Sequence, residues 1–167
     1  MAEIEELLQT AREEEGGRSM TGGADSPFLS REEVADKIKD HYELIAEIRE
    51  KYGKYIDHEA KRHSIAPALI AAIIAKESRG KPEAGSRAGA QGLMQLMGPT
   101  AEEHGVTDRY DPKQNIKGGS AEIARLIKAF GSEDKALAAY NFGWGNMRKF
   151  EAGKRELPRE TQEYVPV

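Results

Sequence analysis

The stretch from Pro67 to Glu77 constrains the fold of this chain more than any other, because it is apolar on nearly every side. It reads Pro-Ala-Leu-Ile-Ala-Ala-Ile-Ile-Ala-Lys-Glu, and proline suits the first turn of a helix. A helix that is apolar all round is typical of a protein interior. The sequence therefore predicts a buried helix over residues 67–77 around which the other elements pack.

Glu77, at the end of that helix, stands where a carboxylate is not expected for stability. The negative end of the helix dipole and the apolar neighbours both disfavour its charged form, so we expect a raised pKa. A carboxyl group that is still protonated near neutral pH is what a general acid requires. The alternative is a solvated glutamate at a helix end, since most glutamates are exposed.

Helical spacing of apolar residues recurs on both sides of this stretch. Ser30 and Glu33 form a capping box that predicts a helix ending near Gly53, and a second helix follows through His63. Beyond Glu77 we expect an irregular glycine-rich loop over residues 80–92. Helices are expected over residues 99–104, 115–130 and 132–140, and a short helix in the tail from residue 158. No strand pattern is convincing, so the prediction is an all-α fold, mostly helical with an irregular loop region.

The N-terminal part differs in composition from the rest. Residues 2–15 form a short amphipathic pattern rich in glutamate, and residues 16–27 have the small, polar composition of a linker. We therefore predict an N-terminal segment with a glycine-rich linker over residues 1–29 and one folded domain over residues 30–167.

Composition excludes several functional classes. The chain has 29 acidic and 25 basic residues and a net charge of −4, which argues against a nucleic-acid partner bound through phosphates. It has no cysteine, so neither a disulfide framework nor a thiolate metal site is possible. The N-terminus is acidic where a signal peptide is basic, and no apolar run reaches membrane-spanning length. We expect no signal peptide and no integral membrane segment.

His58 and His63 resemble a zinc-protease pair, but that motif needs histidines four residues apart. These are five apart, and at about 100° per residue the two rings diverge by roughly 140°. We therefore predict two exposed helix histidines and no metal site.

Four segments resemble, in order, the motifs of the soluble lytic transglycosylases that cleave bacterial peptidoglycan, relatives of goose-type lysozyme. They are Glu77-Ser78, the run Ser-Arg-Ala-Gly-Ala-Gln-Gly-Leu-Met-Gln-Leu-Met over residues 86–97, Ala139-Tyr140-Asn141, and Glu-Thr-Gln-Glu-Tyr-Val over residues 160–165. The resemblance covers residues 54–165. It implies a lysozyme-like helical domain, acting as a monomer without a cofactor, with a groove for peptidoglycan glycan strands.

The resemblance makes Glu77 the single catalytic acid and base, which cleaves the bond between N-acetylmuramic acid (MurNAc) and N-acetylglucosamine (GlcNAc) with formation of a 1,6-anhydro ring. Ordinary glycosidases use two carboxylates that flank the bond. Glu83 lies in the loop, and no acid occurs between Gly85 and Met97. The absence of a second matching acid favours transglycosylation over hydrolysis, although Asp108 or Asp111 could approach in space.

The resemblance also implies substrate-binding residues, each with an ordinary structural alternative. In the loop, Ser86 and Gln95 would contact sugar and Met97 would pack on it; alternatively, Ser86 forms a turn and Gln95 is a plain polar residue. We expect Ser78 to close its helix rather than bind substrate.

In the third and fourth motifs, Tyr140 would point its hydroxyl at the catalytic carboxyl, and Asn141 would contact an N-acetyl group. Glu160 would orient groups at the groove, and Tyr164 would line it. The alternatives are core packing for Tyr140 and Tyr164 and helix capping for Asn141. For Trp144, the single tryptophan, we expect packing.

Two rival functions stay open: a goose-lysozyme-type hydrolase of the same bond, and a non-catalytic peptidoglycan-binding or structural module. Action on the cell wall, in the periplasm or outside the cell, is expected in each case. A chain without a signal peptide suggests a phage-encoded or virion-associated protein, cargo of another secretion route, or a chain whose leader has been removed.

Overall fold

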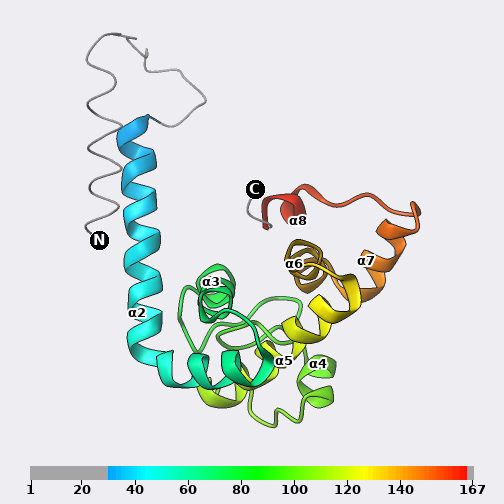
Figure 1. Cartoon of the computed structure of the whole chain (residues 1–167), viewed down its shortest axis with the longest axis horizontal. Coiled ribbons are helices and arrows are strands. Elements are labelled where there is room, and N and C mark those ends of the chain that lie inside the picture. Colours follow the sequence, from blue (N-terminus) through cyan, green and yellow to red (C-terminus); the bar gives the residue numbers. More distant parts are fainter. Residues whose placement is uncertain (1–29, 165–167) are drawn as a thin grey trace. The chain divides into compact units, whose positions relative to one another are not determined.

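Seven helices make up the described part of the chain, residues 30–164, in this computed structural model (Figure 1). In chain order they are α2 (Arg31–His63), α3 (Pro67–Ser78), α4 (Gly98–Glu103), α5 (Pro112–Phe130), α6 (Glu133–Phe142), α7 (Trp144–Glu151) and α8 (Arg159–Tyr164). No strand occurs among these residues, where isolated β-bridges pair Gln91 with Gly85 and with Leu96. The predicted all-α class with an irregular loop region is confirmed.

The chain divides into two units between Lys37 and Ile38. The described part of the first unit is residues 30–37, where the predicted capping box is present. The backbone N–H of Glu33 donates to Ser30 Oγ at 3.2 Å, and the backbone N–H of Ser30 donates to Glu33 Oε2 at 2.7 Å. The amphipathic segment and linker predicted within residues 1–29 lie outside the described residues, so the boundary before residue 30 stays a prediction.

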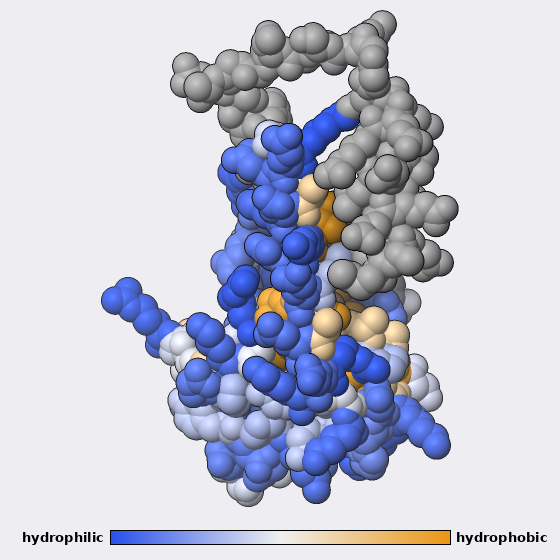
Figure 2. All heavy atoms as spheres, turned by 90° about the vertical axis from the view of Figure 1, so that its left-hand side faces the viewer, coloured by the Kyte–Doolittle hydropathy of each residue, from blue (hydrophilic) through white to orange (hydrophobic). Residues whose placement is uncertain are grey.

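Helix α2 is continuous through Gly53, where two separate helices were predicted, but Figure 1 shows its ribbon bending sharply where the colour passes from cyan to green. A glycine inside a helix costs about 1 kcal/mol, and burial of Ile48 and Ile56 on either side offsets that cost. Within the second unit, Ile38 and Tyr42 are exposed, although they follow the helical spacing of apolar residues that continues to the buried Ile48 and Ile56. Figure 2, which shows the side of the molecule where α2 lies, has a mostly hydrophilic surface interrupted by small apolar patches.

Helix α3 lies in the hydrophobic core, as its sequence predicts. Ile70, Ala71 and Ile74 have no exposed surface, and Ile73 is almost as deeply buried. The same core cluster includes buried residues of α2, α5, α6, α7 and α8. In the described part of the chain, no helix combines the length and apolar character needed to span a membrane.

Helix α5 packs closely against the loop that follows α3, and two glycines permit that approach. A Cβ atom on Gly119 would collide with the side chain of Met94, and one on Gly118 would come within 3.0 Å of Leu96 Cδ1. The loop from Arg79 to Met97 is thereby held against a helix that contributes to the core.

Helix boundaries in the C-terminal half follow local caps. Asp111 caps α5 through Gln114, so that helix begins three residues earlier than predicted. Gly131 ends α5 in the left-handed conformation, and Ser132 caps α6. Helix α7, which begins directly after Gly143, was not predicted, because the glycines around its first residue indicated a turn.

Candidate active site

Glu77 lies in the last turn of α3, and the residues that follow it close the helix. Arg79 adopts the left-handed conformation with φ of 53°, and its backbone N–H donates to the Ala75 carbonyl. Ser78 is buried; its hydroxyl donates to the Ile74 carbonyl at 3.1 Å and accepts from the Gly80 N–H at 3.2 Å. Ser78 therefore closes the helix, as expected, and the half-buried Glu77 side chain starts from a rigid support.

Tyr164 on α8 provides the direct partner of Glu77. Its hydroxyl donates to Glu77 Oε1 at 2.6 Å, and the ammonium of Lys76 lies 5.7 Å from the centre of its ring. Burial raises the pKa of Glu77, while the Tyr164 hydrogen bond and the charge of Lys76 oppose that rise. The predicted direction of the pKa is confirmed, and desolvation is its main cause.

Glu160 is the carboxylate whose charge also raises the pKa of Glu77. The other candidate acids have different tasks. Asp111 caps α5, Asp108 Oδ1 accepts from the Tyr110 N–H at 2.9 Å, and Glu83 is exposed on the loop. Glu160 itself is exposed at the start of α8.

The loop before α4 is held in place by Asn115, which has no exposed surface. Its Nδ2 donates to the carbonyls of Gln91 at 3.0 Å and Arg109 at 2.7 Å, and its Oδ1 accepts from the Met94 N–H at 2.7 Å. A Cβ atom on Gly92 would collide with this amide, so the loop requires glycine there. The sequence pattern indicated Asn115 only as the start of a helix. The signal that could have indicated its role in holding the loop was a polar amide beside the apolar face of α5.

The three predicted substrate-binding residues of the loop differ in their surroundings. Gln95 has a positive φ of 49°, and its Nε2 donates to the carbonyls of Ala84 and Gly92, so it braces the loop. Ser86 is exposed, and its hydroxyl accepts from the Ala90 N–H at 3.0 Å within a turn. Met97 precedes α4 and is 41% exposed, which leaves its thioether free to pack on a ligand.

Tyr140 and Asn141 lie at the end of α6 with contacts that partly differ from expectation. The Tyr140 hydroxyl donates to the Met94 carbonyl at 2.7 Å, and the hydroxyl that contacts Glu77 belongs to Tyr164 instead. The packing of α5 brings this loop carbonyl close to Tyr140, and the charge of Glu77 adds to burial in raising the pKa of the Tyr140 hydroxyl. The expected orientation of Tyr140 toward the catalytic carboxyl stays a prediction. Asn141 Oδ1 accepts from the Thr161 hydroxyl at 2.8 Å, which links α6 to α8.

A hollow of about 380 Å³ adjoins these residues. Gln95, Met97, Tyr140 and Asn141, all predicted to bind substrate, line part of it. The rest of the wall comes from α4, α5 and the segment after α6, and is formed by Leu96, Thr100, Glu103, Glu122, Arg125, Ala139, Phe142, Gly143 and Trp144. Trp144 is 37% exposed and packs edge-on against Phe130 at 5.1 Å, so the prediction of simple packing was incomplete.

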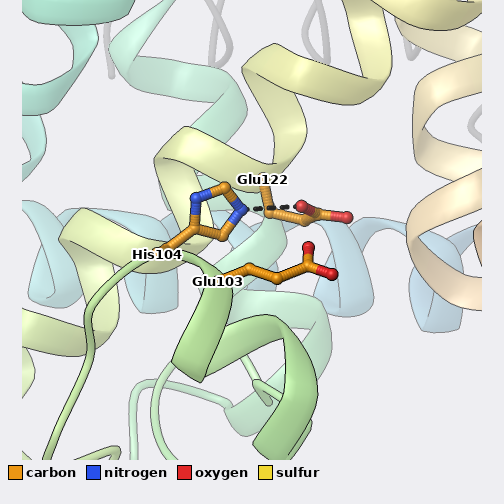
Figure 3. Close-up of side chains that lie close together, drawn as sticks. All are labelled: Glu103, His104 and Glu122. Atoms are coloured by element: carbon orange, nitrogen blue, oxygen red, sulfur yellow. Dashed lines mark hydrogen bonds and ion pairs between the residues drawn. The ribbon is translucent and has the colours of Figure 1, made fainter.

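Three groups in this region lie close enough together to surround a cation: Glu103, His104 and Glu122 (Figure 3). Their ligand atoms lie within 4.8 Å of one another. However, both oxygens of Glu122 already have partners, because His104 Nε2 lies 2.8 Å from Oε2 and Arg125 donates to both. A positive guanidinium at this distance opposes a second cation.

His58 and His63 of α2 were both predicted to be exposed, and this is wrong for His63. His58 is exposed, but His63 is half-buried, and both approach the buried carboxylate of Glu59, at 2.9 Å and 3.4 Å respectively. The rings reach opposite oxygens of one carboxylate because Glu59 lies one residue from His58 and four from His63.

Comparison with known proteins places this site in a family. Residues 54–162 match the family model described as the transglycosylase SLT domain. A transglycosylase of Enterobacteria phage PRD1 is 42% identical over 109 residues, which cover 62% of this chain and 41% of that protein. The membrane-bound lytic murein transglycosylase F of Desulfosudis oleivorans is 42% identical over 118 residues, which cover 66% of this chain and 26% of that protein.

Solved structures show the same fold. The complex of the 70-kDa soluble lytic transglycosylase with bulgecin A superposes with a TM-score of 0.64 at 27% identity, covering 79% of this chain and 25% of that one. An inactive glutamate-to-glutamine mutant of the lytic transglycosylase Slt from Pseudomonas aeruginosa gives 0.62 at 27% identity, with 79% and 27% covered. The chain thus spans between a quarter and about two fifths of the length of these proteins.

Proposed function

Because the chain belongs to the transglycosylase SLT domain family, we propose that it is a peptidoglycan lytic transglycosylase in which Glu77 is the single general acid and base. The observation that carries this proposal is the environment of Glu77. Burial raises its pKa, a tyrosine hydroxyl holds one of its oxygens, and its neighbouring carboxylate Glu160 is exposed on a different helix. A single residue that must both give and take a proton needs such an environment.

In the proposed reaction, protonated Glu77 donates its proton to the oxygen that joins C1 of MurNAc to GlcNAc. The C1–O bond breaks, and GlcNAc leaves as an alcohol. The C6 hydroxyl of the same MurNAc then bonds to C1 and gives its proton to the Glu77 carboxylate. Glu77 returns to its protonated state, and a 1,6-anhydro ring forms without consumption of water.

The surrounding residues have supporting roles in this proposal. Tyr164 keeps one oxygen of Glu77 in place, so that the other oxygen faces the scissile bond. Gln95, Met97 and Asn141 lie along the hollow, and Ser86 is exposed on the loop. Tyr140 acts mainly as a buried brace, since its hydroxyl is bonded to the Met94 carbonyl.

Relatives support the substrate and the need for a glutamate. Lytic murein transglycosylases are among the similar proteins, and one structural neighbour is an inactive mutant in which glutamate is replaced by glutamine. We propose that the chain acts as a monomer on peptidoglycan glycan strands at the cell wall. Similarity to a phage transglycosylase supports the hypothesis of a virion-associated enzyme, which detection of the protein in purified virions would test.

One observation favours the hydrolytic alternative. The charge of Glu160 acts on Glu77, so a water molecule between the two carboxylates could be activated as in an ordinary glycosidase. Hydrolysis would leave reducing MurNAc ends, whereas transglycosylation leaves 1,6-anhydro-MurNAc ends. Mass spectrometry of digested sacculi distinguishes the two products, and reducing ends alone would contradict our proposal.

The test of the catalytic residue is Glu77→Gln, which keeps the size of the side chain and an acceptor for Tyr164 but cannot transfer a proton. We expect a loss of about 10²- to 10⁴-fold in turnover, measured by release of muropeptides. The matched control is Glu83→Gln, on the exposed loop, which should keep wild-type turnover. Wild-type protein that binds sacculi without cleaving them would instead support a binding module.

A further inference from the structure

Helix α2 contacts the turn that follows Glu77. Ile48 and Tyr52 supply this contact, and both approach Gly80, three residues after Glu77. Because the two side chains are four residues apart, they lie on the same face of the helix. The family match begins at residue 54, so this pair, which we call the Ile48–Tyr52 face, comes from a part of the chain that the family model does not include.

Gly80 lies very close to this face. A Cβ atom on Gly80 would come within 3.0 Å of Ile48 Cγ1, so the contact requires glycine. The hydroxyl of the partly buried Tyr52 donates to the Gly80 carbonyl at 3.4 Å, which is a long hydrogen bond. Burial and the charge of Glu83 raise the pKa of Tyr52, so its hydroxyl keeps the proton that it donates. The contact therefore combines close apolar packing with one polar interaction.

The turn that this face covers ends the helix that carries Glu77. Arg79 and Gly80 both have a positive φ, of 53° and 77° respectively. The Arg79 N–H donates to the Ala75 carbonyl at 3.2 Å, which closes the last turn of α3. A residue other than glycine in the left-handed region is strained, and it persists only where its surroundings hold it. The Ile48–Tyr52 face supplies such support from outside the helix.

The position of the Glu77 carboxyl depends on this backbone. Tyr164 holds one of its oxygens from α8, at 2.6 Å, but the side chain itself starts from the last turn of α3. A movement of that turn would therefore displace the carboxyl relative to a bound substrate. A misplacement of 1 Å can cost about 100-fold in rate, even when its cause lies far from the chemistry.

We propose that Ile48 and Tyr52 are positioning residues for Glu77, because they hold the Arg79–Gly80 turn and so fix the backbone from which the carboxyl extends. The catalytic role of Glu77 in this proposal rests on the proposed function. Neither positioning residue lines the hollow described above. Their loss should therefore lower the rate of turnover and leave the binding of substrate unchanged.

The first test compares two tyrosines of α2 in the full-length protein, with kcat and KM measured on soluble GlcNAc–MurNAc oligosaccharides. Tyr52→Phe removes only the hydroxyl, and it should lower kcat about 2- to 10-fold, the loss expected for one hydrogen bond, with KM unchanged. Tyr55→Phe is the matched control. The Tyr55 ring is partly buried in the same cluster, but within residues 30–164 its hydroxyl has no hydrogen-bond partner. This variant should keep the wild-type kcat and KM.

The second test compares two isoleucines of α2, Ile48 and Ile56, which are 1% and 0% exposed. Substitution by valine removes the Cδ1 atom from each, so both variants should lower the urea midpoint of unfolding by similar amounts. Ile48 Cδ1 lies 3.6 Å from the Cβ position of Gly80, so only Ile48→Val should also lower kcat, by about twofold or more. An equal fall of kcat in Ile56→Val would show that general stability limits turnover, and would overturn the proposal.

Amide hydrogen exchange tests the contact independently of activity. Exchange of the Arg79 amide should be about 2- to 10-fold faster in Tyr52→Phe and unchanged in Tyr55→Phe. An unchanged kcat in Tyr52→Phe, or a raised KM with an unchanged kcat, would overturn the positioning role and leave the proposed function intact. If the wild-type protein does not cleave, the proposed function fails, and the exchange rate alone decides whether the Ile48–Tyr52 face holds the turn.

Discussion

At the scale of single residues, the chemistry of Glu77 depends on neighbours that act in opposite directions. Burial and the charge of Glu160 raise its pKa, and the hydrogen bond from Tyr164 and the charge of Lys76 lower it. A general acid must hold its proton at the working pH and still release it, so the balance between these neighbours determines the pH range of activity.

Tyr164→Phe should raise the pKa of Glu77, because it removes a hydrogen bond to the ionised form while the ring keeps the site buried. The alkaline limb of the pH profile of kcat/KM, where Glu77 loses its proton, should therefore move to higher pH. Loss of a hydrogen bond to a charged group should also lower kcat/KM about 10- to 100-fold.

Glu160→Gln should have the opposite effect on the pH profile. Removing this negative charge lowers the pKa of Glu77, so the alkaline limb should move to lower pH. A shift in the same direction as that of Tyr164→Phe would contradict this account of the site. Complete loss of turnover in Glu160→Gln would favour the hydrolytic mechanism.

At the scale of elements, the contact between α5 and the loop before α4 positions the site. Asn115 bonds three backbone groups around that contact, and Gly118 and Gly119 allow the helix to approach. Because Met94 takes part in the contact and also accepts the Tyr140 hydroxyl, a change in the packing of α5 would reach the substrate-binding residues.

Gly119→Ala should destabilise the protein by about 1–3 kcal/mol, because the new Cβ would collide with Met94. The free energy of unfolding is measured by urea denaturation. Gly145→Ala in α7 is the matched control, since nothing lies within 4 Å of its Cβ position. Alanine there should be neutral or stabilise by up to about 1 kcal/mol. Equal destabilisation by both changes would refute the packing explanation.

At the scale of the whole molecule, the core that supports the site is built from residues of the second unit. The buried members of the main cluster run from Ile48 to Tyr164, and partly buried residues extend it to Leu44. The sequence separates residues 1–29 from this domain as an amphipathic segment and a linker.

Deletion of residues 1–29 should therefore leave the midpoint of thermal unfolding within a few degrees of wild type and turnover on sacculi within about twofold. Differential scanning calorimetry and muropeptide release provide the two measurements. A large drop in the midpoint would show that the predicted boundary at residue 30 is wrong.

The sequence by itself determined the features that depend on neighbours within about four residues. These include the capping boxes and caps at Ser30 and Ser132, the apolar helix α3 and the acid at its end. Four ordered motifs also identified the family. Helix α7 was missed because its glycines suggest a turn, and α2 was divided at Gly53 because local propensity does not register the burial on either side.

Only the tertiary structure decided which groups meet across long separations. Tyr164 reaches Glu77 across 87 positions, and Tyr140 reaches Met94 across 46, and the assignment by motif identified neither of these two hydrogen bonds. The wall formed by Arg125, Glu122 and Trp144 likewise joins α5 to the start of α7. Helical spacing specifies which face of a helix is buried, but the packing of whole helices determines what that face contacts.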